Sequence, residues 1–319
     1  MYNNEPIFLQ PVFQERIWGG QKLRTEFDYE IPSEKTGEAW VISAHPHGPS
    51  KIINGSLAGQ TLADAWNEHK EIFNKAEDEQ GEYPLLVKIL DAADDLSVQV
   101  HPDDEFARTA ENVPYGKTEC WYVLSAEEGA ELVLGHNAKT QEEFDQMIDR
   151  GEWDKLLRGV KVKAGDFVYV PSGTIHAIGK GIVILETQQS SDITYRLYDY
   201  ERTDVAGNKR ELHLERSAQV STIPHQDAPV EQVEQVNGDL IEKRLVKEQY
   251  FSVYHWQLSG QATCEMTADF LQVSVVEGQS TLTIDGKSFD LKKGMHFILP
   301  HSVTTYRLEG NAEFIVSHE

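Results

Sequence analysis

The sequence contains little cysteine and no long apolar segment. Its two cysteines, Cys120 and Cys264, are too few for a disulfide-built scaffold, and so low a number is typical of a reducing compartment. No apolar run approaches the roughly 18–20 residues that a helix needs to cross a bilayer. The first six residues contain neither a basic stretch nor an apolar one, so we expect no signal peptide and a cytoplasmic location.

Positive charge is also scarce. The 319 residues include 29 Lys and Arg against 53 Asp and Glu, which gives a formal net charge of −24. Nucleic acid and anionic membranes are therefore excluded as general partners, because both attract basic surfaces. An anionic substrate would need a local group of Lys or Arg, so any such group is more noticeable in this chain. Nothing in the sequence indicates a protein partner.

A chain of this length is expected to fold into about two domains. A polar connector rich in Gln, Glu and Val covers residues 223–238, and we place the boundary there, with domains at 1–225 and 226–319. Residues 240–319 carry many short strand patterns separated by turns, and no helical pattern. The fold is predicted to be mainly β.

Two helical regions interrupt the β pattern in the N-terminal half. Thr61 can cap a helix in which apolar residues recur as far as Phe73. Thr140 begins a capping box that is followed by an apolar stripe, and a further short helix is expected at Trp153. We assign these helices to packing and no chemistry to them.

A pair of histidines, His45 and His47, has the spacing of two ligands on one strand face. The prolines and the glycine around them predict a turn instead. We interpret the pair as part of a surface loop.

The sequence contains a weak internal repeat. Residues 165–176 and 294–305 each have a glycine, a run of mostly apolar residues, a proline and a turn at the same offsets. Two related small β-barrels explain this similarity. The first copy ends in His176 and the second in Thr305, so a metal in the first barrel is not expected to have a counterpart in the second. The histidines of the C-terminal part lack a second ligand at useful spacing and are assigned structural or surface roles: His255, His296 and His301.

One strand carries an unusual polar face. Apolar residues alternate in 96–101 with Ser97, Gln99 and His101, so the three polar side chains point to one side. Pro102 follows, which places the imidazole at a strand end, where loops surround a pocket. Taken alone, this pattern also fits an exposed edge strand with an incidental histidine.

Four residues of the first predicted barrel have the chemistry of metal ligands. Gln99 and His101 lie on that strand, Glu119 lies at the entry to the next strand, and His176 lies in the turn that ends the first repeat. Two imidazoles, a carboxylate and an amide oxygen suit zinc and leave a position for water or substrate. A structural zinc site would use thiolates, and none is placed to do so. We therefore expect an open catalytic site with one Zn²⁺ per chain.

Residues 165–176 follow the pattern Gly-Asp-x-x-x-x-Pro-x-Gly-x-x-His, which is the second sequence signature of the cupin barrel. With it, the chain resembles the type I mannose-6-phosphate isomerases, also called phosphomannose isomerases. The similarity spans residues 6–200 and includes Trp18-Gly19-Gly20, Gly37-Glu38-Ala39-Trp40 with His45-Pro46, the segment 96–103, Lys117-x-Glu119, His176-Ala177, Glu186, Ser191-Asp192 and Arg196.

The resemblance implies two cupin-like jelly-roll barrels, with a few short helices inserted in the N-terminal half and a degenerate C-terminal barrel. It implies zinc ligands at Gln99, His101, Glu119 and His176, and a zinc-dependent interconversion of mannose 6-phosphate and fructose 6-phosphate. The family's Asn-His-Lys-Pro-Glu is Tyr115-Gly116-Lys117-Thr118-Glu119 here. There is also no room before His176 for the large helical domain of the long members, so the chain is similar to the compact bacterial form.

Such an isomerisation requires ring opening and the movement of a proton between two carbons through an enediol. Lys117 and Glu186 are the two candidate bases, and the sequence does not separate them. The alternative role of each is a structural one, as a lysine or a carboxylate held in an ion pair.

The resemblance also implies an active-site arginine at Arg196, whose guanidinium suits phosphate or enediolate oxygens. A structural salt bridge with Asp192 or Asp199 is its alternative role. Ser97 either donates to the phosphate or is a plain strand serine, and Lys117 is also assigned to substrate binding.

Two other functions are weighed against this one. Another metallo-cupin enzyme, such as an iron dioxygenase, would favour three histidines or two histidines with a carboxylate, so Gln99 and the pair Lys117 and Arg196 fit it less well. A cupin that only binds a sugar would not need Lys117 and Glu119 beside the ligand set.

Overall fold

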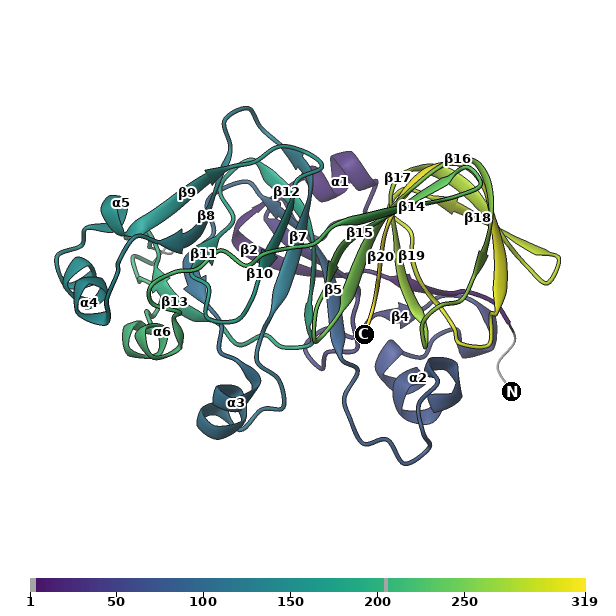
Figure 1. The fold of residues 1–319 in the computed structure, drawn as a ribbon, viewed down its shortest axis with the longest axis horizontal. Coiled ribbons are helices and arrows are strands. Elements are labelled where there is room, and N and C mark those ends of the chain that lie inside the picture. Colours follow the sequence, from purple (N-terminus) through teal and green to yellow (C-terminus); the bar gives the residue numbers. More distant parts are fainter. Residues whose placement is uncertain (1–3, 204–205) are drawn as a thin grey trace.

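The computed structural model describes residues 4–203 and 206–319, and its fold is mainly β, as predicted. Residues 1–3, part of the segment in which we expect no signal peptide, lie outside the described residues. The strands form three open sheets, and short helices lie at their edges (Figure 1). Closure into two barrels therefore stays a prediction.

Two antiparallel sheets of the N-terminal part face each other. The six-stranded sheet has the order β10 (Phe167–Val170), β7 (Glu119–Ala126), β12 (Ile182–Gln189), β5 (Leu85–Ala92), β3 (Thr36–Ile42), β2 (Val12–Gly20). The five-stranded sheet has the order β13 (Tyr195–Tyr198), β6 (Val98–Val100), β11 (His176–Ala177), β8 (Glu131–His136), β9 (Leu157–Lys161). A shared core joins them, with Leu90 and Trp121 from the first sheet and Leu132 from the second.

A nine-stranded sheet forms most of the C-terminal part. Its order is β14 (Val233–Asn237), β15 (Leu240–Lys247), β16 (Ser252–Glu265), β20 (Thr305–His318), β17 (Leu271–Ile284), β19 (His296–Leu299), β1 (Ile7–Gln10), β4 (Lys51–Ile52), and β18 (Lys287–Lys292) pairs with β17. Because β1 and β4 come from the N-terminal part, this sheet includes strands from both sides of the predicted boundary. Domains at 1–225 and 226–319 therefore stay a prediction.

Three strands of this sheet, β16, β17 and β20, are each 14 residues long, where the sequence predicts many short strands. Gly260 and Gly310 are register partners in the pairing of β16 with β20, at φ of 147° and 140°. Glycine adopts such angles without a side-chain clash, so the strands continue through these positions. Glycine inside a strand pattern resembles a turn signal, which explains the error.

The helices are α1 (Lys22–Phe27), η1 (Gly55–Leu57), α2 (Leu62–Glu68), η2 (Lys70–Phe73), α3 (Asp104–Phe106), η3 (Ala107–Glu111), α4 (Gln141–Asp149), α5 (Trp153–Leu156) and α6 (Leu214–Val220). Thr61 caps α2 and forms a reciprocal capping box with Asp64. The helix is shorter than predicted, because His69 leaves the helical region at φ −134° and ψ 56°. The 3-10 turn η2 then continues to Phe73.

The second predicted helical region is also present. Thr140 caps α4 by accepting a hydrogen bond from the backbone N–H of Glu143, and α5 begins at Trp153 as expected. Among residues 4–203 and 206–319, none of the helices has the length and apolar character needed to span a membrane.

Candidate functional site

The site lies where a row of side chains on the six-stranded sheet faces a row on the five-stranded sheet. Register aligns four residues across β3, β5, β12 and β7: Trp40, Lys88, Glu186 and Trp121. It aligns three across β13, β6 and β11: Arg196, Gln99 and His176. Directly opposed residues of antiparallel strands point to the same face, so each row forms one wall.

Three buried polar side chains meet between these walls. His101 directly follows β6, Glu119 begins β7 and His176 begins β11, and none is more than 1% exposed. Nε2 of His101 lies 3.6 Å from Oε2 of Glu119, and Nε2 of His176 lies 3.3 Å from Oε1. The fold thus brings together three residues that the sequence predicts to be metal ligands.

The hydrogen bonds of the two imidazoles fix their tautomers. Nδ1 of His101 donates to the carbonyl of Ile193 at 2.7 Å, and Nδ1 of His176 donates to that of Thr174 at 2.8 Å. A carbonyl can only accept, so each neutral ring carries its proton on Nδ1 and a lone pair on Nε2. Burial lowers the pKa of both histidines, which favours the neutral form that a metal requires.

Both Nε2 atoms are buried and have no hydrogen-bond partner among the described residues. Unpaired buried polar atoms are costly, and two nitrogens that converge on a carboxylate fit a divalent cation such as zinc. Gln99 is the register partner of His176 and lines the neighbouring cavity, so its amide oxygen fits as the fourth donor. That these four residues bind zinc stays a prediction.

A cavity of about 390 Å³ opens beside the histidines and Glu119. The predicted substrate and catalytic residues all line it: Ser97, Lys117, Glu186 and Arg196. Lys117 also reaches the metal-ligand set, because its Nζ lies 2.7 Å from Oε2 of Glu119. A substrate in this cavity would therefore lie against the metal position.

Lys117 and Glu186 face each other across the cavity, with Nζ 3.7 Å from Oε1. Burial opposes the charge on Lys117, but Glu119 and Glu186 outweigh it and raise the pKa of this lysine. Burial and the charge of Glu119 raise the pKa of Glu186, although Lys117 and Lys88 act against them. Lys117 is thus held as a cation, whereas the pKa of Glu186 lies above the ordinary value of a carboxyl group.

Sequence reasoning missed Lys88, although this residue lines the cavity. Its Nζ lies 3.5 Å from Oε1 of Glu186 and 5.1 Å from the centre of the Trp40 ring. All eight residues of β5 are buried, and a lysine in such a strand signals a functional position because a buried ammonium needs a partner. The cavity-lining pair Arg16 and Glu38, 2.9 Å apart, was missed as well.

Arg196 projects from β13 into the cavity. Its Nε donates to Oγ of Ser97 at 3.3 Å, and Nη1 donates to the carbonyl of Glu211 at 2.8 Å. Within the described residues it forms no ion pair, so the alternative of a salt bridge with Asp192 or Asp199 is wrong. Asp192 lies against His47, and Asp199 is held by other arginines, which leaves the Arg196 charge available to a ligand.

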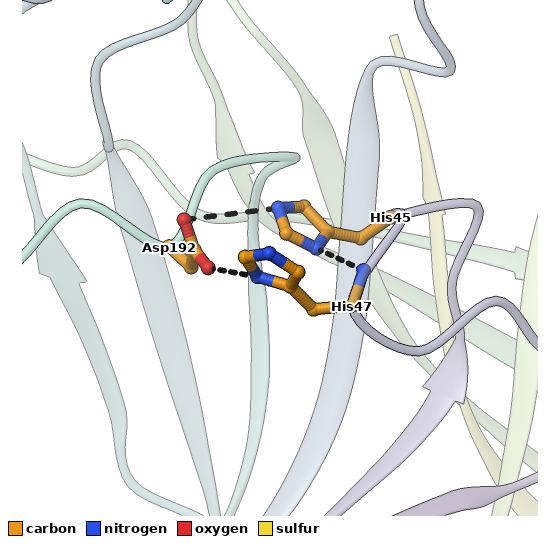
Figure 2. Close-up of side chains that lie close together, drawn as sticks. All are labelled: His45, His47 and Asp192. Atoms are coloured by element: carbon orange, nitrogen blue, oxygen red, sulfur yellow. Dashed lines mark hydrogen bonds and ion pairs between the residues drawn. The ribbon is translucent and has the colours of Figure 1, made fainter. Parts of the chain in front are cut away.

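Figure 2 shows His45, His47 and Asp192 close together, and Asp192 lines the cavity. Nδ1 of His47 lies 2.6 Å from Oδ2 of Asp192, and Nε2 of His45 lies 3.8 Å from Oδ1. His47 is exposed as predicted, but the surface interpretation is wrong for His45, which is buried edge-on against Trp40. The backbone N–H of His47 donates to Nδ1 of His45. The proton of the neutral His45 ring is therefore on Nε2, which suits a hydrogen bond to a carboxylate better than a metal.

The two facing sheets, with a histidine–carboxylate set beside a polar cavity, define a cupin-type protein with a candidate metal centre. Residues 7–134 match the family described as phosphomannose isomerase type I, catalytic domain, and residues 241–319 match the mannose-6-phosphate isomerase, cupin domain.

Relatives and a solved structure agree over nearly the whole chain. The mannose-6-phosphate isomerase ManA of Bacillus subtilis (strain 168) is 51% identical over 318 residues, covering 98% of this chain and 99% of that protein. The mannose-6-phosphate isomerase of Streptococcus mutans is 51% identical over 314 residues, covering 98% of each. The crystal structure of the mannose 6-phosphate isomerase from Bacillus subtilis has a TM-score of 0.95 at 47% identity, covering 98% of this chain and 99% of that one. The chain belongs to the type I phosphomannose isomerase family, which confirms the resemblance.

Proposed function

We propose that this protein is a zinc-dependent aldose–ketose isomerase that interconverts mannose 6-phosphate and fructose 6-phosphate through an enediol intermediate. The observation that carries the proposal is the convergence of two unpaired Nε2 atoms and the Glu119 carboxylate beside a cavity that holds Lys117 and Arg196. The names of the full-length relatives support the choice of substrate.

The metal is proposed to bind to His101, Glu119 and His176, with Gln99 as the fourth protein ligand. A bound zinc ion supplies positive charge for the oxygens on the two carbons between which the proton moves. Nδ1 hydrogen bonds to the Ile193 and Thr174 carbonyls hold the imidazoles in position for that role.

The remaining chemistry belongs to side chains of the cavity. Glu186 has one buried oxygen, Oε1, without a hydrogen bond in the described part of the chain, and two lysines lie within 3.7 Å of it. This arrangement supports Glu186 as the proton carrier, because a carboxylate of raised pKa both takes up and returns a proton. Lys117 stays the second candidate, and as a cation it stabilises the negative charge of the intermediate. Arg196 and Ser97 are proposed to bind the substrate's anionic oxygens.

The proposal extends to the organisation of the chain. We propose a catalytic cupin domain in residues 1–225 and a degenerate cupin-like β domain in residues 226–319, each a jelly roll. A cytoplasmic location is supported by the state of the two cysteines, which are both free and buried.

A coupled assay tests the function directly. The purified protein is given mannose 6-phosphate, and fructose 6-phosphate is measured before and after treatment with a chelator and again after zinc is restored. We expect turnover that the chelator abolishes and zinc restores. Absence of chelator-sensitive turnover would contradict the isomerase and favour a binding protein, whereas substrate-dependent oxygen consumption would favour the iron dioxygenase.

A further inference from the structure

Five cationic side chains line the cavity: Arg16, Lys88, Lys117, Arg196 and Arg210. Three of them face carboxylates within the site, as Arg16 does with Glu38 at 2.9 Å, Lys88 with Glu186 at 3.5 Å and Lys117 with Glu119 at 2.7 Å. Their charges are therefore largely compensated by the protein. The remaining two, Arg196 and Arg210, lie together at one side of the cavity. Arg210 pairs with Asp199, whereas Arg196 forms no ion pair among the described residues.

Three arginines gather around Asp199 at this side of the cavity. Asp199, whose side chain is 6% exposed, accepts from Nε of Arg210 at 2.7 Å, from Nη2 of Arg210 at 2.5 Å and from Nη2 of Arg202 at 2.6 Å. Arg196 is the third arginine, and burial together with Arg210 lowers its pKa. Asp94 also lies near this group, with Oδ2 3.8 Å from Nη1 of Arg202. Two carboxylates against three guanidiniums leave one positive charge in a chain of net charge −24.

The two arginines on Asp199 differ in what else they reach. Arg210 lines the cavity, and its Nη1 has no hydrogen-bond partner among residues 4–203 and 206–319. Arg202 does not line the cavity and donates instead to the backbone carbonyl of Asp95. Asp199 therefore fixes the guanidinium of Arg210 through two nitrogens and leaves the third nitrogen available to a ligand.

We infer that Arg210, positioned by Asp199, binds the phosphate group of the substrate together with Arg196 and Ser97. This inference rests on the proposed function and assigns the phosphate site within it. Guanidinium groups bind the oxygens of a phosphate dianion through charge-assisted hydrogen bonds, and in the described part of the chain both the unpaired Arg196 and the free Nη1 of Arg210 are available for them. Arg196 is the register partner of Gln99, so this group of arginines lies next to the proposed metal ligands and on one side of them. A sugar phosphate can then reach the metal with one end and the arginines with the other.

The test compares three variants in the full chain with zinc bound. Arg210→Gln removes both the positive charge and the planar guanidinium group, whereas Arg210→Lys keeps only the charge. Arg202→Gln removes the other arginine partner of Asp199 and leaves the residues that line the cavity unchanged. For each, KM and kcat for mannose 6-phosphate, the inhibition constant of inorganic phosphate and the zinc content are measured. We expect Arg210→Gln to raise both KM and the phosphate inhibition constant about 10- to 100-fold, with zinc content unchanged. Arg210→Lys should fall between wild type and Arg210→Gln, and Arg202→Gln should change either constant by less than about threefold.

Two results would overturn the inference: unchanged constants in Arg210→Gln, or an equal rise in Arg202→Gln, which would mean that Arg210 acts only through the fold. Calorimetric titration of inorganic phosphate separates this inference from the proposed function. A wild-type protein that binds phosphate through Arg210 but does not turn over mannose 6-phosphate supports the anion site and contradicts the isomerase. If the wild-type protein turns over mannose 6-phosphate and Arg210→Gln has the same KM and kcat, the isomerase is supported and the anion site is contradicted.

Discussion

The N-terminal and C-terminal parts of the molecule both bury histidine, and they differ in what the imidazoles contact. His101 and His176 each engage Nδ1 with a carbonyl and leave Nε2 without a partner. His296, on β19, has both nitrogens engaged, because Nε2 lies 2.7 Å from the hydroxyl oxygen of Tyr29 and Nδ1 lies 2.8 Å from that of Ser274. Burial is the same in all three cases. The unpaired nitrogen is what distinguishes a ligand position from a packed one.

The internal repeat shows the same difference between the two parts. His176 is buried at the start of β11, whereas Thr305 is exposed at the start of β20. Within the part of the chain that the structure describes, both groups of three ionisable residues close enough to hold an ion lie in the N-terminal part. Of the two groups, the one formed by His101, Glu119 and His176 has the Nε2 atoms without a partner among the described residues, so we expect one zinc ion per chain at that group.

The largest expected effect comes from removing a histidine whose Nε2 is unpaired. His101→Ala and His176→Ala should each lose the zinc. The activity loss should exceed the roughly 10–100-fold that follows when only a hydrogen-bond partner of a metal ligand is removed. His296→Ala is the matched control and should keep one zinc per chain. Metal analysis of the three purified variants makes the comparison, and zinc retained by His101→Ala would contradict the ligand assignment.

Carboxylates permit a second comparison. Glu186→Gln should lower kcat by about 10²- to 10⁴-fold and leave the zinc bound, because the proposed proton carrier is lost. Glu313 in the C-terminal sheet also has a close polar partner, His255 at 2.8 Å, and Glu313→Gln should leave kcat unchanged. Steady-state kinetics with zinc analysis gives both values. Full activity in Glu186→Gln would assign the proton transfer to Lys117 instead.

Burial lowers the pKa of all three histidines, and His296, which lies away from the proposed metal, allows the effect on stability to be measured. Burial lowers the pKa of His296 to about 3, far below that of the unfolded chain. The unfolded state thus takes up a proton near pH 6.5 that the folded state does not, and stability is lost as the pH falls from 6.5 towards 3. Between pH 6.5 and 4 this residue should cost about 3 kcal/mol of unfolding free energy. Denaturant unfolding of the wild type and of His296→Gln at several pH values measures this contribution. If the unfolding free energy of both proteins changes equally with pH, the effect is excluded.

The ligand set could be predicted from the sequence because its signals are local. Strand alternation places Gln99 and His101 on one face, and the glycine–proline turn before His176 marks the end of another element. The mainly β fold follows from patterns of the same kind. What each of these residues binds stays a prediction.

The residues that sequence reasoning missed depend on tertiary contacts. Lys88 meets Glu186 only through the register of β5 with β12, and a lysine in an apolar run does not show what its ammonium faces. His45 is buried because Trp40 packs against it, whereas the prolines beside it are typical of exposed turns. Arg210 has a functional position only because Asp199 holds it.

The smallest expected effect tests whether the contacts of His296 are structural alone. Tyr29→Phe removes the hydroxyl that accepts from Nε2 of His296 and donates to the carbonyl of Gly294 at 3.0 Å. The buried N–H then lacks a partner, which should lower the unfolding free energy by about 1–3 kcal/mol. Zinc content and kcat should stay at the wild-type values, because no ligand of the N-terminal site touches Tyr29. Urea unfolding and metal analysis of this one variant give both readings, and a loss of zinc would mean that the two parts of the molecule are coupled.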